Sequence, residues 1–246
     1  QLGMIRELLD VLGIVWWEKA GFEGDDLIAT VAEHAEKAGN DLIVVTGDRD
    51  SYQLVRDPHI RVLYNKRGVS DYALYNEAGI FERTGVTPAQ YADYAALRGD
   101  PSDNLAGIPG VGEKTAAKLI NQYGDIDGVL AAAEAQTPKL KAGLIEHGER
   151  VKRNAAMMIL RRDVPLEVDL NALAPQPDMA GAARMFEFLE FKTMTKRLSD
   201  VAKSLNWETR GEAAPVIAGV ALPESNEVLG KVSVAESVGE VVAMLG

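Results

Sequence analysis

The 246-residue chain is long enough for one large domain or two small ones, and its composition, 47% hydrophobic and 26% charged, is that of an ordinary globular protein. It contains no cysteine, so disulfides and thiolate metal sites are excluded, and a metal would need oxygen ligands or one of three histidines. A net charge of −11 argues against a broadly basic nucleic-acid-binding surface, although clustered carboxylates that hold cations would contribute to it. No apolar run approaches the roughly 18 residues of a membrane span and no signal-peptide pattern opens the sequence, so we expect a cytoplasmic protein.

Hydrophobic periodicity predicts α/β organisation in the first third of the chain. Helical spacing marks residues 2–13 and 25–38, and each of these helices ends at a glycine. Short apolar runs at 14–17, 42–46 and 60–64 predict strands. The run at 42–46 is continuous and rich in β-branched residues, as in a buried parallel strand. We therefore expect a parallel sheet with helices packed against it.

From about Thr87 onward the pattern predicts helices joined by glycine and proline. The expected helices are residues 88–98, 113–123, 126–133 and 138–160, with two shorter ones within 181–205. The composition predicts these segments: an α/β core at 1–86, a helical subdomain at 87–205, a linker at 206–215 and the start of a further unit, with strands at 216–221 and 228–234, at 216–246. Because Gln1 already lies inside a predicted helix, we expect the chain to be a piece of a longer protein.

Acidic residues concentrate in three loops at the places where an α/β fold carries its chemistry. Open sheets bind ligands at the carboxyl ends of their strands, and neighbouring carboxylates repel each other unless a cation or proton lies between them. Hard oxygen ligands favour Mg²⁺ or Mn²⁺. The acids are Glu23, Asp25 and Asp26 at a helix start, Asp48 and Asp50 after the strand at 42–46, and Asp100 and Asp103 after the helix at 88–98.

Each acidic loop also has a structural interpretation. Asp25 is a plausible helix N-cap, with Glu23 and Asp26 placed to favour the positive end of the helix dipole. The other four acids lie in turn-forming sequences rich in glycine, proline, serine and asparagine. Capping explains the first loop well when it is taken alone. Turn preference explains seven acids in three such loops less well than cation binding does.

A glycine-rich segment at 107–115 follows the third acidic loop and opens a helix. Its glycines allow close approach to a phosphate, and the helix start offers unpaired N–H groups and a positive dipole. The segment does not match a nucleotide-binding P-loop, because Glu113 separates Gly112 from Lys114. A helix-hairpin-helix that grips DNA backbone phosphates without reading sequence fits better, and an ordinary helix-helix turn is the alternative. The candidate DNA-binding residues are Arg98, Gly110, Gly112, Lys114, Thr115 and Lys118.

Four ordered motifs resemble a known family. They are Gly-Phe-Glu-Gly-Asp-Asp at 21–26, Val-Val-Thr-Gly-Asp-Arg-Asp-Ser-Tyr-Gln-Leu at 44–54, Leu-Arg-Gly-Asp-Pro-Ser-Asp-Asn at 97–104 and Gly-Ile-Pro-Gly-Val-Gly-Glu-Lys-Thr-Ala at 107–116. In this order they resemble the 5′-nuclease domain (5′-3′ exonuclease, flap endonuclease) of bacterial DNA polymerase I over about residues 1–205. The resemblance implies a PIN-like or resolvase-like α/β fold with a helical hairpin subdomain. It also implies that residues 216–246 begin a 3′-exonuclease-like domain, with polymerase domains in the same parent chain.

The resemblance further implies a two-metal nuclease acting on 5′ ends or flaps of branched duplex DNA in replication and repair. Two Mg²⁺ or Mn²⁺ ions, about 3.5–4 Å apart, would activate a water and neutralise charge on the phosphate. K⁺ is implied at the hairpin, between about residues 107 and 115. The first metal site would use Glu23, Asp25 and Asp26, the second Asp48, Asp50, Asp100 and Asp103, and the catalytic set is Asp25, Asp48, Asp50 and Asp103.

One departure from the family pattern affects the expected activity. The family begins with a strand that carries a further metal-binding aspartate, followed by a helical arch, and this sequence has no match to either. We therefore expect weak or no cleavage by this chain alone. Two rivals remain open: a non-catalytic module that grips duplex DNA through the hairpin, and a phosphatase that uses Asp48 and Asp50, which would leave the hairpin and the other acids without a role.

Overall fold

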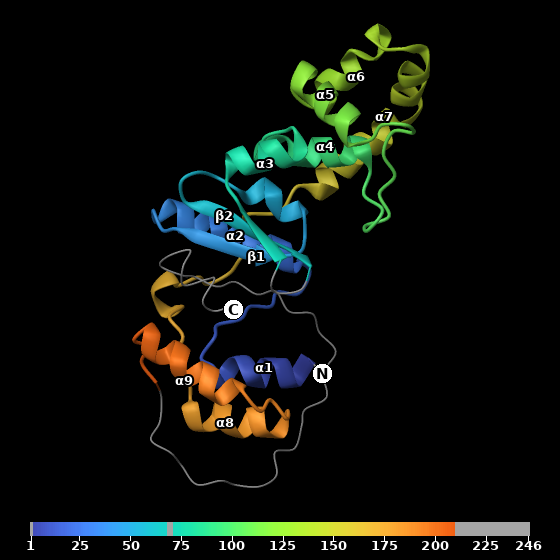
Figure 1. Ribbon diagram of the computed structural model, residues 1–246. Coiled ribbons are helices and arrows are strands. Elements are labelled where there is room, and N and C mark those ends of the chain that lie inside the picture. Colours follow the sequence, from blue (N-terminus) through green and yellow to red (C-terminus); the bar gives the residue numbers. More distant parts are fainter. Residues whose placement is uncertain (1, 68–70, 210–246) are drawn as a thin grey trace. The chain divides into compact units, whose positions relative to one another are not determined.

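The computed structural model describes residues 2–67 and 71–209 (Figure 1). The chain divides into two compact units, one from residues 1–43 and 163–246 and the other from residues 44–162. The predicted unit at 216–246 and most of the predicted linker lie outside the described residues. No described helix is both long and apolar enough to cross a membrane.

The first unit contains two groups of helices. The amphipathic helix α1 (Leu2–Val11) packs on α8 (Met179–Phe188), which packs on α9 (Met194–Ser204). Helix α2 (Gly24–Lys37) buries one apolar face, with Val31 fully inaccessible to solvent. The buried Thr30 hydroxyl of α2 accepts a hydrogen bond from the backbone amide of Val164 at 3.1 Å, which joins the two ends of this unit. The predicted helices in these regions are confirmed, with bounds shifted by at most two residues.

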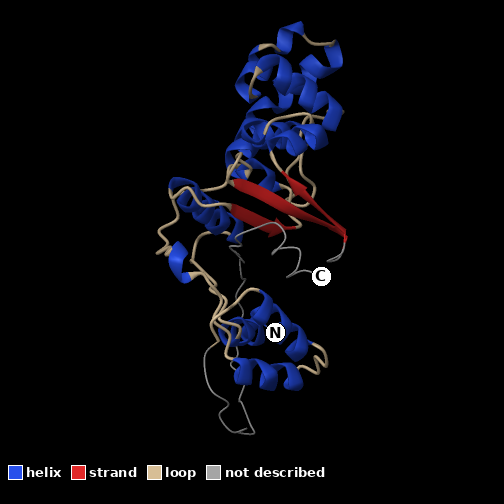
Figure 2. Cartoon of the chain, turned by 60° about the vertical axis from the view of Figure 1, so that its left-hand side comes forward, coloured by secondary structure: helices blue, strands red, loops and turns tan. Residues whose placement is uncertain are grey.

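The sheet has three strands in the order β1 (Leu42–Thr46), β2 (Ile60–Arg67) and β3 (Asp71–Tyr75), drawn in red in Figure 2. The pair β2–β3 is antiparallel, whereas the sequence predicted a parallel sheet. A parallel partner needs a crossover of about a dozen or more residues, but only three sequence positions lie between Arg67 at the end of β2 and Asp71 at the start of β3. The sequence missed β3, although Tyr72 and Leu74 alternate with smaller or charged residues.

The strand predicted at residues 14–17 is wrong. Only Trp17 shows an isolated bridge, and the rest of the run is irregular. The backbone amide of Ile14 donates to the carbonyl of Leu9 at 2.9 Å, so the helix end uses a donor that a strand ladder would need. Gly13 adopts a positive φ of 66° and lies so close to the Gln176 backbone that a Cβ would meet its oxygen at 2.4 Å. The apolar run therefore leaves the helix through a tight turn and packs as a loop.

The second unit is helical after the sheet. Helices were predicted from about Thr87 onward, whereas the helix at Glu77–Thr84 was not predicted. Figure 1 shows α4 to α7 gathered into one bundle, in which α4 packs on α5 and on α7. Tyr52 and Tyr91 are each 1% exposed and lie edge to face at 5.4 Å, part of a tyrosine cluster that includes Tyr64 and Tyr75 of β2 and β3. The helices of this unit are α3 (Glu77–Thr84), α4 (Tyr91–Arg98), α5 (Glu113–Tyr123), α6 (Ile126–Ala131) and α7 (Pro138–Met158), with short 3-10 turns at Asp50–Leu54, Pro88–Gln90 and Ala133–Ala135.

Candidate active site and helical hairpin

The first acidic loop caps α2 in the first compact unit. The N-cap is Glu23, not Asp25 as the sequence suggested: its side chain accepts from the backbone amide of Asp26, whose carboxylate in turn accepts from the Glu23 amide at 3.3 Å. This reciprocal pair is a capping box, and Asp25 and Asp26 occupy the first turn, where negative charge suits the helix dipole. The capping interpretation therefore holds for Glu23 and Asp26, and a capping carboxylate still keeps oxygen lone pairs for other partners.

The second acidic loop leaves β1 in the second unit. The amide of Asp48 donates to the Thr46 hydroxyl at 2.9 Å, and the Asp48 carboxylate accepts from the amide of Asp50 at 2.9 Å. These local bonds make an Asx-type turn that starts the 3-10 helix at Asp50. They fix the Asp48 carboxylate at the carboxyl end of a sheet strand, the position that the sequence predicted for it.

The third acidic loop follows α4 in the same unit. Asp100 is 9% exposed and accepts hydrogen bonds from the hydroxyl of Ser102 and, at 2.9 Å, from its amide, while Arg98 lies 3.3 Å away. Burial alone would raise the pKa of Asp100, but these donors and the backbone of Asp103 together lower it. Asp100 is therefore held ionised in a nearly buried position.

The second and third loops bring three of the predicted acids into electrostatic reach of one another. Partial burial, and then the charges of Asp100 and Asp48, raise the pKa of the Asp103 carboxyl. Asp50 lies close enough to raise the pKa of the buried Tyr91 hydroxyl, although burial of that hydroxyl is the larger cause. A cation placed among Asp48, Asp100 and Asp103 would remove their mutual repulsion, so the donor set fits a hard divalent ion. Within residues 2–67 and 71–209, no group of three or more acidic or histidine side chains is already arranged as a ligand shell.

Two arginines converge beside these acids. The Nη1 atoms of Arg49 and Arg98 each lie 3.6 Å from the same oxygen, Oε1 of Glu113. Arg98 also donates through Nε to the Gly99 carbonyl at 3.1 Å and stacks on the Tyr94 ring at 5.5 Å. Arg98 is therefore fixed from three sides between the third acidic loop and the start of α5.

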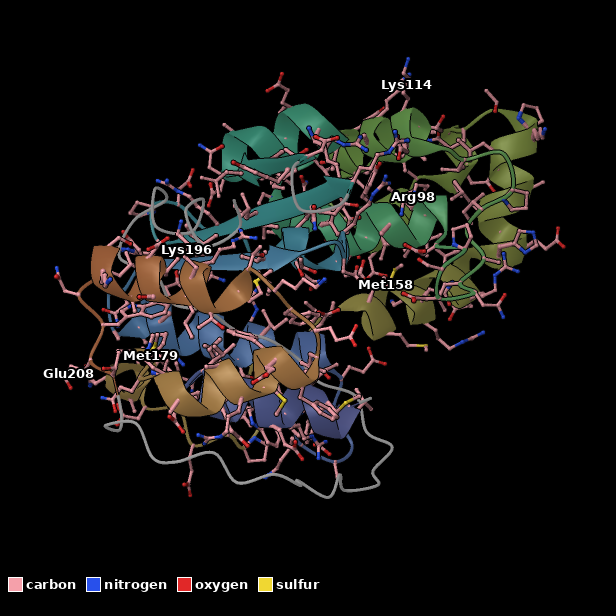
Figure 3. The ribbon with its side chains drawn as sticks, turned by 60° about the horizontal axis from the view of Figure 1, so that its bottom comes forward. Arg98, Lys114, Met158, Met179, Lys196 and Glu208 are labelled. Atoms are coloured by element: carbon pink, nitrogen blue, oxygen red, sulfur yellow. The ribbon has the colours of Figure 1, made fainter. Side chains whose placement is uncertain are left out.

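The predicted hairpin has an open helix start. Gly110 adopts a φ of 83°, a conformation that strongly favours glycine, while Gly112 is the N-cap of α5 with extended backbone angles. Gly112 has no side-chain cap, and a Cβ there would meet nothing within 4 Å. Lys114 and Lys118 are exposed on α5, and Figure 3 shows Lys114 projecting away from the helix. The first amides of α5 are thus available to an anion.

Side chains from α7 hold the hairpin in place. Arg150 donates to the carbonyl of Gly107 at 2.8 Å, and the buried Asn154 donates to the carbonyl of Ala106 at 3.1 Å. Gly99 and Gly107 approach so closely that a Cβ on Gly107 would lie 2.4 Å from the backbone nitrogen of Gly99. The hairpin is therefore fixed to the end of α4, next to the third acidic loop.

Sequence reasoning missed several residues of this site. Arg49 and Glu113 stand inside the quoted motifs but were not recognised as partners, because their pairing joins segments more than 60 positions apart in the sequence. Lys139 is the second residue of α7 and places Nζ 3.9 Å from where a Gly110 Cβ would stand, so it adds charge at the hairpin. Its position after Thr137-Pro138, a helix start, was the available indication. Arg150 and Asn154 gave no local signal.

Comparison with known proteins places these features in a family. Residues 1–85 match the model of the 5′-3′ exonuclease N-terminal resolvase-like domain, and residues 86–180 match the 5′-3′ exonuclease C-terminal SAM fold. DNA polymerase I of Mycobacterium leprae is 48% identical over 199 residues, which are 80% of this chain and 22% of that protein. DNA polymerase I of Mycobacterium tuberculosis is 43% identical over 224 residues, 91% of this chain and 25% of that protein. The chain thus spans about a quarter of the length of these curated relatives.

Solved structures agree with this fold. A flap endonuclease of bacteriophage T5, described as a pseudo-enzyme-product complex with DNA and metal ions, matches with a TM-score of 0.54 at 18% identity, covering 76% of this chain and 62% of that one. A T5 5′-exonuclease with bound zinc ions matches with a TM-score of 0.52 at 20% identity, covering 58% of this chain and 51% of that one. Together with the ordered motifs, the acidic loops and the hairpin, these matches show that the chain belongs to the 5′-3′ exonuclease family and carries a domain homologous to the N-terminal region of bacterial DNA polymerase I.

Proposed function

We propose that this chain is the metal-dependent 5′-nuclease part of a DNA polymerase I, hydrolysing phosphodiester bonds at 5′ ends or flaps of branched duplex DNA. The observation that supports the proposal is that the charges of Asp100 and Asp48 reach the Asp103 carboxyl, in the compact unit that also holds the glycine hairpin. The carboxylates suit a divalent cation, and the glycine hairpin suits a backbone phosphate. A nuclease needs both within the reach of one DNA strand.

Each group of residues has its own proposed role. The hairpin would grip a backbone phosphate through the α5 amides, with Lys114, Thr115 and Lys118 adding donors and charge. Two Mg²⁺ or Mn²⁺ ions, when bound, would supply water activation and neutralisation of phosphate charge. The proposed ligands are Glu23, Asp25 and Asp26 for one ion and Asp48, Asp50, Asp100 and Asp103 for the other.

The wider setting of the activity belongs to the same proposal. We expect the parent protein to act in the cytoplasm, with its polymerase domains in the same chain, on RNA primers and repair flaps. A K⁺ ion held by backbone carbonyls of the hairpin would add positive charge near the phosphate. The homologous flap endonuclease of phage T5 was described in complex with DNA and metal ions, which supports the partner and the cofactor class.

A second candidate is a DNA-binding module without catalysis. It is favoured by one observation: the described acids form no ready-made group of three metal ligands. In that case the hairpin would still bind duplex DNA, and Arg98 would still contact a phosphate. Divalent metal would then change neither binding nor strand integrity.

A cleavage assay separates the two functions. The chain is incubated with a 5′-labelled flap duplex in Mg²⁺ or in EDTA, beside Asp48→Asn and, as a charge-matched control, the exposed Glu82→Gln. Asparagine keeps the oxygen that accepts from the Asp50 amide, so the turn is preserved while the charge is lost. Because this chain has no match to the first strand and arch of the family pattern, nuclease function predicts weak but Mg²⁺-dependent product from wild type and Glu82→Gln, and less from Asp48→Asn. Binding with no product in any condition would favour the module instead.

A further inference from the structure

We propose that Arg49 and Arg98 form a clamp for a DNA backbone phosphate, and that the carboxylate of Glu113 occupies this clamp in the DNA-free protein. The inference rests on the proposed function, because it takes DNA as the ligand. Two guanidinium groups repel each other, and here both point to one oxygen of Glu113 at 3.6 Å. The two arginines therefore form a binding site for a negatively charged oxygen, and this oxygen of Glu113 occupies it.

The clamp is pre-arranged by contacts that do not involve Glu113. Arg98 is 14% exposed and is held by the Gly99 carbonyl, the Asp100 carboxylate and the Tyr94 ring. Arg49 donates a hydrogen bond to the Tyr64 side chain, which raises the pKa of its guanidinium. Removing the Glu113 charge should therefore leave both arginines near their present positions.

The occupant Glu113 is less firmly held than Arg98, which is the more buried half of the clamp. The side chain of Glu113 is 51% exposed, and that of Arg49 is 42% exposed. Both pairs are longer than a hydrogen bond, so each has the small stability contribution typical of a solvent-exposed ion pair. A phosphate brought in by the polyanionic DNA backbone offers more oxygens in the fork geometry that arginine prefers. Glu113 can accordingly be displaced at little cost.

The location gives the clamp a role in the reaction. Arg98 contacts Asp100, which lies within electrostatic reach of Asp103. On the other side, Glu113 is the first residue of α5, next to the Gly112 N-cap. A phosphate in the clamp would therefore connect the strand gripped by the hairpin to the acids. Glu113 would offset one of the two positive charges of the clamp until that strand arrives, which disfavours binding of stray anions.

The test compares DNA affinity across charge-matched variants of the whole chain. Binding of a fluorescent 5′-flap duplex is measured in EDTA, so that no strand is cut, for wild type, Glu113→Gln and the control Glu82→Gln. The same Glu113 substitution is then made in an Arg49→Gln/Arg98→Gln background. Glu113→Gln is expected to tighten binding about three- to tenfold, because two arginines become free for the phosphate, whereas Glu82→Gln changes it less than about twofold. In the double-arginine background the gain should fall below about twofold.

Other outcomes overturn the inference in recognisable ways. A gain equal to that of Glu82→Gln, or one that persists without the arginines, would show a general charge effect. Weaker binding by Glu113→Gln and by Glu113→Ala, with melting temperatures unchanged, would show that Glu113 aligns the arginines and does not occupy their clamp. Failure of wild type to bind the flap duplex at low salt would instead refute the proposed function, and the inference with it. Melting temperatures of all variants identify any that do not fold.

Discussion

Alanine substitutions at two hairpin glycines should have different effects: one should lower stability, and the other should weaken DNA binding. Gly110 has a φ of 83°, so an alanine there incurs the left-handed penalty of about 1–2 kcal/mol, partly offset by about 0.4–1 kcal/mol from the stiffer unfolded chain. A Cβ on Gly110 meets only Lys139, at the ordinary distance of 3.9 Å, so no clash adds to this cost. At the midpoints of these ranges, Gly110→Ala should therefore lower the free energy of unfolding by about 0.8 kcal/mol, or about 2–3 °C in melting temperature.

Gly112 differs from Gly110 in its backbone conformation and in the space around a new Cβ. Its φ of −101° and ψ of −175° are open to alanine, and a Cβ would meet nothing within 4 Å. The loss of a good N-cap residue and the gain from a stiffer unfolded chain are each below about 1 kcal/mol and opposite in sign, so stability should change by less than about 0.5 kcal/mol. The new methyl group would stand in front of the α5 amides, where the proposal places a phosphate. Losing one such charged hydrogen bond should weaken DNA binding by about tenfold or more.

The assay is urea unfolding together with flap-duplex binding in EDTA, for both variants and wild type. We expect Gly110→Ala to be destabilised and Gly112→Ala to be as stable as wild type but weaker in DNA binding. Tight DNA binding by a stable Gly112→Ala would refute the assignment of the α5 start as a phosphate site. Equal stability of Gly110→Ala and wild type would refute the argument from the left-handed turn.

Further predictions concern packing and charge. Asn154→Ala should cost about 1–3 kcal/mol in urea unfolding, because it removes the buried donor to the Ala106 carbonyl, and a cost below about 0.5 kcal/mol would show that α7 does not anchor the hairpin. Burial raises the pKa of Asp93 above that of the unfolded chain, so its stabilising contribution is present at low pH and is lost as pH rises through the folded value. Asp93→Asn, which keeps an acceptor for the Ile126 amide, should thus gain stability relative to wild type between about pH 3 and pH 6, and a pH-independent difference would contradict this reasoning. Asp103→Asn should keep or increase stability in EDTA but lose the rise in melting temperature on adding Mg²⁺, and a full Mg²⁺ effect in that variant would exclude Asp103 as a ligand.

The sequence predicted the helices, strands and motifs that can be identified from a few consecutive residues. The helices at α2 and α5 and the strand β1 follow from periodicity and from glycine punctuation, so they were found. The run at 14–17 has the composition of a strand, but a strand also needs a partner ladder, and composition does not show whether one is present. Strand β3 was missed because its residues, Asp-Tyr-Ala-Leu-Tyr, lack the continuous β-branched run that marks β1.

The same distinction applies to the site. The acids and the hairpin stand in short motifs, and the sequence placed Asp48, Asp100 and Asp103 correctly in loops that end structural elements. Their mutual reach depends on how the 3-10 turn at Asp50–Leu54 packs on α4, which no motif encodes. The pairing of Arg49 with Glu113 depends on that packing too. The sequence therefore identified the types of residue in the site, and only the structure shows which of them lie beside one another.

We propose that Asp48, Asp100 and Asp103 hold a divalent cation. A calorimetric titration of the DNA-free chain with Mn²⁺ measures that binding. Wild type, Asp48→Asn, Asp103→Asn and the control Glu82→Gln are titrated under the same buffer and salt. Wild type and Glu82→Gln should bind Mn²⁺ with the same affinity. Both aspartate variants should bind Mn²⁺ at least about tenfold more weakly, because each loses one charged oxygen ligand. Mn²⁺ binding that is absent from wild type, or unchanged in both aspartate variants, would contradict this proposal.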